Sequence, residues 1–154
     1  MADRYQRPYL DAIAWVEALS GKGFYSADLA EVLKAADRGA LTIVMSVLMP
    51  LEVLGGTRLE RAEGDVDRAL RAVGRSSIAQ VGVTARIVRE ARQLRLDYRL
   101  KSMDALHLAS AAAGRADAFL SNDDQVLKLG TYRGVPIRKP TWPGDMGLTN
   151  LADV

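Results

Sequence analysis

The feature that most constrains the fold is a set of short apolar runs separated by helical segments. Residues 41–45 form a continuous β-prone run without alternating polar positions, which is typical of a strand that is covered on both faces. Similar short runs are found at 8–11, 77–83, 118–120 and 135–137. Because strands that alternate with helices favour parallel pairing, the sequence predicts an α/β sandwich around a central, mostly parallel sheet.

The helical segments between these runs are marked by apolar spacing and by residues that begin or end helices. They cover 12–19, 26–39, 48–54, 60–73, 84–94, 102–113 and 124–129. In the segment over 84–94, the residues expected to face the core are Ile87, Val88, Ala91 and Leu94. Ser102 is expected to cap the helix that follows it, and Gly114 to terminate that helix.

Length and composition favour one domain, over residues 1–154, with an ordinary core. We place the core at 7–138 and expect the Pro- and Gly-rich tail at 139–154 to be irregular. The chain has no cysteine, which excludes disulfides, cysteine-ligated zinc and thiol catalysis, and which fits a reducing compartment. The sequence shows no signal-peptide pattern at its start and no apolar run near the roughly 18 residues of a membrane helix.

Four acidic residues follow strands or begin helices. Asp11 ends the first apolar run, Asp123 lies just past the run at 118–120, Glu52 lies shortly after the central run, and Asp104 is in the first turn of an Ala- and Leu-rich helix. Ionised carboxylates are rarely buried without a partner, and ligands of parallel sheets lie beyond the carboxyl ends of the strands. We therefore expect these acids to meet at one edge of the sheet, where their repulsion requires a cation such as Mg²⁺ or Mn²⁺.

Each of these residues also has a purely structural explanation. Asp11 and Asp123 are placed where a carboxylate caps the following helix, whereas Glu52 and Asp104 can be first-turn acids that suit the helix dipole. His107 follows Asp104 by one helical turn, and it is either a structural hydrogen-bonding residue or a substrate contact. Since it is the only histidine, hydrolysis through a pair of histidines is excluded.

A basic run precedes the helix that carries Asp104. Its members are Arg86, Arg89, Arg92, Arg95, Arg99 and Lys101, opposed within the run only by Glu90 and Asp97. Steps of three residues drift by about 60° around a helix, so these side chains cover a broad face. That face is either a solvated surface or a contact for a phosphate backbone. The formal net charge of +2 adds only weak support for an anionic partner.

Several motifs together resemble a known family. They are Tyr9-Leu-Asp11, Pro50-Leu-Glu-Val53, Asp104-Ala-Leu-His-Leu-Ala109 and Phe119-Leu-Ser-Asn-Asp123. In this order and at these separations they resemble the PIN-domain family and, within it, the small VapC-like toxins of bacterial toxin–antitoxin pairs. No single motif is specific, but the resemblance extends over residues 7–138.

The resemblance implies an acidic site and roles for its residues. The family's acidic positions fall on Asp11, Glu52, Asp104 and Asp123, of which Asp11, Asp104 and Asp123 are the candidate metal ligands. Glu52 is expected to bind metal through a water or to act as the base. The family's polar helper positions fall on Ser46, Ser121 and Asn122.

The resemblance also implies an activity and partners. It implies a ribonuclease that depends on Mg²⁺ or Mn²⁺, cleaves RNA in the cytoplasm, forms a homodimer and does not associate with membranes. The expected protein partner is a small antitoxin that occupies the acidic groove. Arg58, Arg61 and Arg68 are candidate contacts for that antitoxin or for RNA.

Two positions qualify the match. The family usually has a small polar residue two positions after the first Asp, where this chain has Ile13. Such a residue orients a water or a phosphate, so its absence bears on the catalytic rate more than on the fold. The second is the family's last acidic position, which either Asp123 or Asp124 could occupy. The Ser-Asn-Asp match favours Asp123.

Three classes of function remain open at this level. The first is the metal-dependent endoribonuclease, and the second is a PIN-like module that binds RNA or protein without cutting, for which Ile13 is the motive. The third is a receiver-like domain phosphorylated on one Asp. It lacks the expected acidic pair near the N-terminus and an obvious lysine partner after the last core strand.

Overall fold

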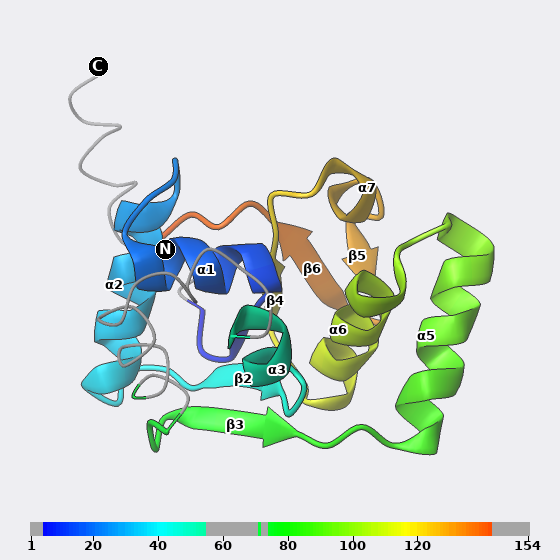
Figure 1. The fold of residues 1–154 in the computed structure, drawn as a ribbon, viewed down its shortest axis with the longest axis horizontal. Coiled ribbons are helices and arrows are strands. Elements are labelled where there is room, and N and C mark those ends of the chain that lie inside the picture. Colours follow the sequence, from blue (N-terminus) through cyan, green and yellow to red (C-terminus); the bar gives the residue numbers. More distant parts are fainter. Residues whose placement is uncertain (1–4, 55–70, 72–73, 143–154) are drawn as a thin grey trace.

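The computed structural model describes residues 5–54, 71 and 74–142, which form an α/β sandwich (Figure 1). The strands are β1 (Pro8–Leu10), β2 (Ile43–Ser46), β3 (Ile78–Val81), β4 (Ala118–Leu120), β5 (Thr131–Tyr132) and β6 (Val135–Arg138). In the described part of the chain they make one sheet in the order β3-β2-β1-β4-β6-β5. All neighbouring pairs are parallel except β5 and β6, so the predicted fold class is confirmed.

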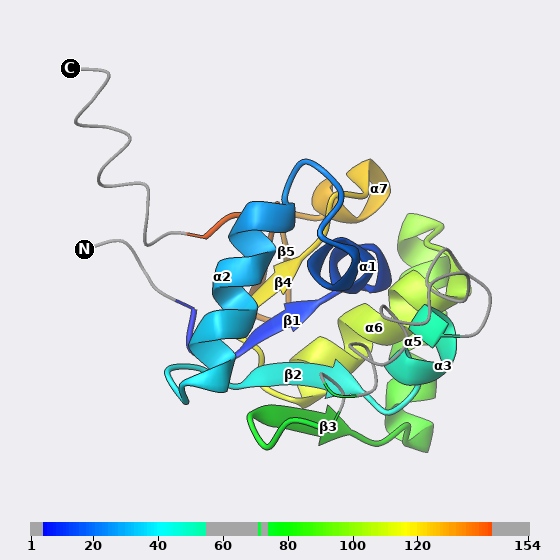
Figure 2. The same ribbon diagram turned by 60° about the vertical axis from the view of Figure 1, so that its left-hand side comes forward.

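Helices cover both faces of the sheet. They are α1 (Ala12–Ser20), α2 (Ser26–Asp37), α3 (Met49–Leu54), α5 (Ala85–Tyr98), α6 (Ser102–Ala113) and α7 (Asp124–Leu127). As Figure 2 shows, α1 and α2 lie on one side of the sheet, and α5 and α6 lie on the other. The helix expected over 60–73 falls, except for Arg71, outside the described residues, as do the candidate contacts Arg58, Arg61 and Arg68 and most of the tail.

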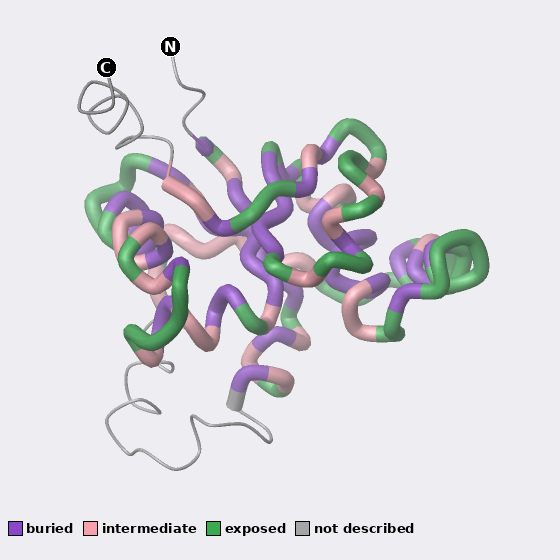
Figure 3. Tube along the Cα trace, turned by 90° about the horizontal axis from the view of Figure 1, so that it is seen from above, coloured by how far each residue is buried: buried purple, intermediate pink, exposed green. Residues whose placement is uncertain are grey.

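The central strands carry the core, which is the reason for their uninterrupted apolar sequences. Every residue of β1, β2 and β4 is buried, whereas β3 at the edge is mostly half-buried. Tyr9 in β1 is in register with Val44 on one side and Phe119 on the other. The rings of Tyr9 and Phe119 stack at 5.4 Å with an interplanar angle of 12°. Figure 3 shows the buried strands at the centre of the molecule and the exposed outer face of α5.

The hairpin of β5 and β6 extends the sheet beyond what the sequence analysis expected. Its two-residue turn is Arg133-Gly134, and both residues have positive φ angles, of 48° and 82°. Tight hairpins favour turns with this backbone twist, and glycine at the second position is a usual signal for them. The Arg-Gly pair was the available signal, but a strand of only two residues has no readable periodicity.

Two details of the helices differ from expectation. Helix α5 continues to Tyr98 and ends at Arg99, which has a left-handed backbone (φ 56°). Its buried stripe consists of Ile87, Ala91 and Leu94, while Val88 is 50% exposed, so the stripe is narrower than predicted. Ser102 does not cap α6 but is its first residue, and the cap position is Lys101, which makes no side-chain cap bond.

Gly114 ends α6 for a reason other than the predicted one. Its φ angle is −81°, so no left-handed conformation requires glycine there. Instead, a Cβ atom on Gly114 would lie 2.5 Å from Cγ1 of Val44 and 2.7 Å from Cγ2 of Val81. The helix end therefore approaches β2 and β3 too closely for any side chain.

Replacing Gly114 by alanine is expected to destabilise the protein. The added methyl group must displace packed valine side chains, and overpacking of this kind costs about 1–3 kcal/mol. Urea unfolding followed by circular dichroism measures the change. The matched control is Gly82→Ala, because a Cβ atom there meets nothing within 4 Å, so that variant should be neutral or more stable by about 0.4–1 kcal/mol. Equal stabilities of the two variants would contradict the close-approach explanation.

Within the described residues, no helix is both long enough and apolar enough to cross a membrane.

Candidate functional site

The four predicted acids lie at the carboxyl edge of the parallel strands. Asp11 directly follows β1, Asp123 follows β4 after two residues, and Glu52 is in α3, which follows β2. Asp104 is in the first turn of α6. The helix runs back along the sheet from this edge (Figure 2), so its first turn lies close to the strand ends. The arrangement is the one that parallel strands impose on residues beyond their ends.

Asp11 is the most buried of these acids, at 7% exposed. Its Oδ1 accepts a hydrogen bond from the backbone N–H of Ala14 at 2.8 Å, which caps α1. The side chain of Ser121 forms a second hydrogen bond to it. Burial, with a smaller contribution from the charge of Asp104, raises the pKa of Asp11 to about 6, although these two bonds lower it. The protein thus holds a carboxylate where its charge is disfavoured.

Asp104 interacts electrostatically with each of the other three acids. Its pKa is raised above the ordinary value, first by burial and then by the negative charges of Asp123 and Glu52. The positive charge of Lys101 acts in the opposite direction. Since Asp104 also acts on Asp11, all four predicted acids share one electrostatic environment.

Asp123 caps a helix and also acts electrostatically on another of the four acids. Its Oδ1 accepts from the backbone N–H of Gln125 at 2.8 Å and so caps α7, while its charge acts on Asp104. The backbone N–H of Asp123 donates to Oγ of Ser121 at 3.1 Å. Asp124 is exposed, which agrees with the preference for Asp123.

Glu52 is linked to the core by a chain of buried groups. Its Oε2 lies 2.5 Å from Nε2 of His107, and Nδ1 of His107 lies 2.6 Å from the hydroxyl oxygen of Tyr9. The backbone N–H of Ser46 donates to that same hydroxyl oxygen at 3.2 Å. Burial raises the pKa of Tyr9 well above its ordinary value, despite hydrogen bonds from Ser46. His107 is therefore a buried hydrogen-bonding residue that connects Tyr9 to one of the four acids, Glu52.

The three predicted polar helpers differ in their surroundings. Ser46 and Ser121 are fully buried, while Asn122 is exposed. Oγ of Ser46 accepts from the backbone N–H of Leu48 at 3.2 Å, which fixes the turn into α3. Ile13, where the family has a polar residue, is 62% exposed on α1.

The site contains ligands suited to a hard cation, although they are turned toward protein groups. In the part of the chain that the structure describes, no three acidic or histidine side chains are grouped so that they could hold a metal ion. Asp11 and Asp123 instead accept hydrogen bonds that cap helices, and Glu52 contacts His107. The donor set consists of carboxylate oxygens, which Mg²⁺ and Mn²⁺ prefer. A buried carboxylate with a raised pKa is also a charge that a cation would compensate.

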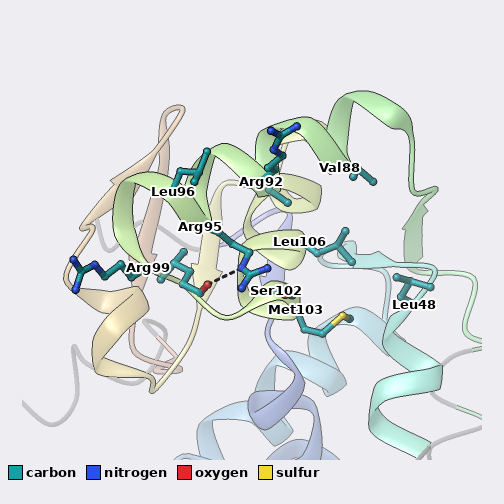
Figure 4. A pocket seen from close by; sticks show the side chains of 11 residues that line it. Leu48, Val88, Arg92, Arg95, Leu96, Arg99, Ser102, Met103 and Leu106 are labelled. Atoms are coloured by element: carbon teal, nitrogen blue, oxygen red, sulfur yellow. Dashed lines mark hydrogen bonds between the residues drawn. The ribbon is translucent and has the colours of Figure 1, made fainter.

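Figure 4 shows a hollow of about 690 Å³ whose lining contains none of the four acids. Arg92 and Arg95 of α5 line it together with Met103 of α6 and Leu48. Met103 directly precedes Asp104, and Leu48 lies one turn before Glu52. The C-terminal half of the basic run therefore shares a hollow with residues that neighbour Asp104 and Glu52 in the sequence.

The PIN domain family model matches residues 9–131 of the chain. The protein belongs to the PIN-domain family. The match spans all four acids and both strands that flank β1. No curated protein matches the chain in the corresponding comparison.

Two solved structures show the same PIN-type fold at low sequence identity. One is VapC20 of Mycobacterium tuberculosis, described as a toxin that cleaves the sarcin–ricin loop, with a TM-score of 0.63 and 14% identity over 84% of this chain and 99% of that one. The other is from VapBC2 of Rickettsia felis bound to a DNA fragment from its promoter, with a TM-score of 0.61 and 14% identity over 87% of this chain and 98% of that one.

Sequence reasoning placed the acids of this PIN domain but gave no role to Tyr9. Two signals were available. A tyrosine inside a fully apolar strand needs a hydrogen-bond partner for its hydroxyl group, and the only histidine lies one helical turn from Asp104. What the sequence could not show is that β1 and α6 place these two side chains in contact.

Proposed function

We propose that this PIN domain is a metal-dependent endoribonuclease and the toxin of a toxin–antitoxin pair. The observation that carries the proposal is the gathering of Asp11, Glu52, Asp104 and Asp123 in one environment that raises the pKa of Asp11 and Asp104. A fold gains no stability from such mutual repulsion. A cluster of this kind suits the binding of a cation and the cleavage of an anionic substrate.

The residues that would hold a divalent cation are Asp11, Asp104 and Asp123, and Mg²⁺ or Mn²⁺ is the expected ion. When bound, the ion supplies an activated water and neutralises charge on the phosphoryl oxygens. Glu52 accepts the proton of the attacking water, since its Oε2 contacts Nε2 of His107 and its other carboxylate oxygen can take up a proton. Ser121 keeps Asp11 in place through its hydrogen bond.

RNA is the substrate that the surroundings of the acids favour. The hollow that Met103 and Leu48 line also carries the cationic side chains Arg92, Arg95 and Arg99. Arginines bind phosphates, and apolar surfaces accept unstacked bases, so a single-stranded or looped RNA fits both features. The RNA-cleaving description of VapC20 agrees with this class of substrate.

The partners we propose are an antitoxin and a second copy of the chain. The fold is shared with a VapBC complex, and large apolar side chains such as Phe24 and Leu51 are strongly exposed, as is common where proteins associate. The antitoxin would cover the acidic groove, and the protein would act on RNA in the cytoplasm.

Cleavage of total RNA by antitoxin-free protein tests the proposal. The reaction is run with Mg²⁺, with Mn²⁺ and with EDTA, using the wild type, Asp104→Asn and the matched control Asp124→Asn. We expect metal-dependent cutting that Asp104→Asn lowers by about 10²–10³-fold, as for removal of one electrostatic group at a reaction centre, and that Asp124→Asn leaves within a few-fold.

A non-catalytic module is the second candidate, favoured by Ile13 at the position of the family's polar residue. Its signature is RNA binding that EDTA does not weaken, without any cutting by folded wild-type protein. Conversely, cutting that is lost in Asp104→Asn and kept in Asp124→Asn would exclude this candidate.

A further inference from the structure

The contacts between Tyr9, His107 and Glu52 link four elements of the fold in series. Ser46 ends β2, Tyr9 is at the centre of β1, His107 is in α6, and Glu52 is in α3. The distances along the series are 3.2 Å, 2.6 Å and 2.5 Å. His107 and Tyr9 are almost completely buried, whereas the side chain of Glu52 is partly exposed. The series therefore starts at the backbone of the core and ends at the acidic cluster.

One assignment of donors and acceptors gives these bonds a single direction. In it, the hydroxyl oxygen of Tyr9 accepts from the Ser46 backbone N–H, and the hydroxyl group donates its own proton to Nδ1 of His107, which lies at 2.6 Å. An Nδ1 atom that accepts a hydrogen bond carries no proton, so the imidazole proton is on Nε2. Nε2–H then donates to Oε2 of Glu52.

We propose that Tyr9 and His107 are positioning residues: their one-directional chain of hydrogen bonds fixes the carboxylate of Glu52 at the acidic cluster. The bond from His107 engages one carboxylate oxygen, Oε2, and a carboxylate has a second oxygen with which it can take up a proton or a water. Helix α3 has only six residues, so it restrains a long side chain weakly by itself. The buried chain provides the missing restraint.

The role of Glu52 as the base rests on the proposed function, but the hydrogen-bond chain can be measured without RNA. The sequence contains one histidine, so tag-free protein labelled with ¹⁵N-histidine gives the signals of His107 alone. Long-range ¹H–¹⁵N correlation spectra report which ring nitrogen carries the proton. We expect the Nε2–H tautomer in the wild type and a changed Nδ1 chemical shift in Tyr9→Phe, which keeps the ring and removes the hydroxyl group that contacts Nδ1.

Kinetics separate positioning from packing. His107→Leu removes the donor to Glu52, while His107→Gln retains an amide N–H that can donate to it. We expect His107→Leu to lower kcat for RNA cleavage by about 10–100-fold, the usual effect of losing a group that orients a reacting one, with KM for RNA unchanged. His107→Gln should retain most of kcat. In a Glu52→Gln background, Tyr9→Phe should cause no further loss, because the residue that the chain positions is already disabled.

The outcomes distinguish the two proposals. A wild-type His107 with a protonated Nδ1, or equal losses in His107→Leu and His107→Gln at matched folded fractions, would overturn the positioning chain. So would a full additional loss from Tyr9→Phe in the Glu52→Gln background. If the wild type cuts no RNA, the proposed function fails, and the tautomer spectra of the wild type and Tyr9→Phe still decide whether the chain exists.

Discussion

Replacing Asp11 by asparagine is expected to abolish RNA cleavage and, at the same time, to stabilise the fold at neutral pH. Asparagine retains the oxygen that caps α1 and contacts Ala14, but it removes the charge that burial and Asp104 disfavour. A candidate metal ligand is lost together with that charge. We therefore expect cleavage to fall by at least about 10²–10³-fold in a protein that unfolds at a higher temperature.

The stability gain of Asp11→Asn should depend on pH in a defined window. The carboxyl group of Asp11 has an ordinary pKa of 3.8 and a folded-state pKa of about 6. Between about pH 4 and pH 6 the folded protein therefore binds more protons than the unfolded chain, so its free energy of unfolding falls as the pH rises. A pKa shift of this size lowers the free energy of unfolding at pH 7 by about 3 kcal/mol.

Urea unfolding of the wild type and Asp11→Asn across this window checks the expectation. EDTA is present throughout, because a bound cation would offset the cost of the buried charge. The two stabilities should be similar near pH 4 and diverge toward pH 7, with a weaker fall remaining in the variant because the pKa of Asp104 is raised as well. Asp124→Asn, at an exposed position, is the control. A variant less stable than the wild type at pH 7 would contradict the assignment of Asp11 as a disfavoured charge.

Truncating Phe119 to alanine is expected to cause the largest loss of stability. Phe119 is fully buried in β4, stacks on Tyr9 and is in register with it. Removing a buried phenylalanine ring costs about 3–5 kcal/mol, out of a total that is about 5–15 kcal/mol for most proteins. Because β4 lies between β1 and β6, the cavity would open under Tyr9 and beside the strand that leads to Asp11.

Thermal and urea unfolding measure this effect, with Phe119→Leu as the matched control. Leucine keeps most of the apolar volume, so its loss should be about 1 kcal/mol. A loss for Phe119→Ala as small as that for Phe119→Leu would show that the site collapses around the cavity and that the stacking of Tyr9 on Phe119 carries little energy.

The fold could be predicted from sequence because its central strands have an unambiguous signal. Strands covered on both faces are near-continuous apolar runs, and β1, β4 and the part of β2 before Ser46 have this pattern. Features that depend on how closely two elements approach each other could not be predicted from the sequence in this way. Gly114 had the expected position at a helix end, but its cause is contact with Val44 and Val81, which only the packing of α6 against the sheet creates.

The sequence by itself determined the α/β class, the order of the elements and the placement of the four acids at strand ends and helix starts, because periodicity and helix signals are local properties of the chain. Whether those acids share one environment, whether the arginines of α5 line a hollow together with Met103, and whether Tyr9 reaches Glu52 through His107 were decided only by the tertiary structure. Such relations join residues up to 98 positions apart. The distance between two side chains depends on the crossing of β1, α3 and α6, which is set by packing of the whole core and not by the residues near either one.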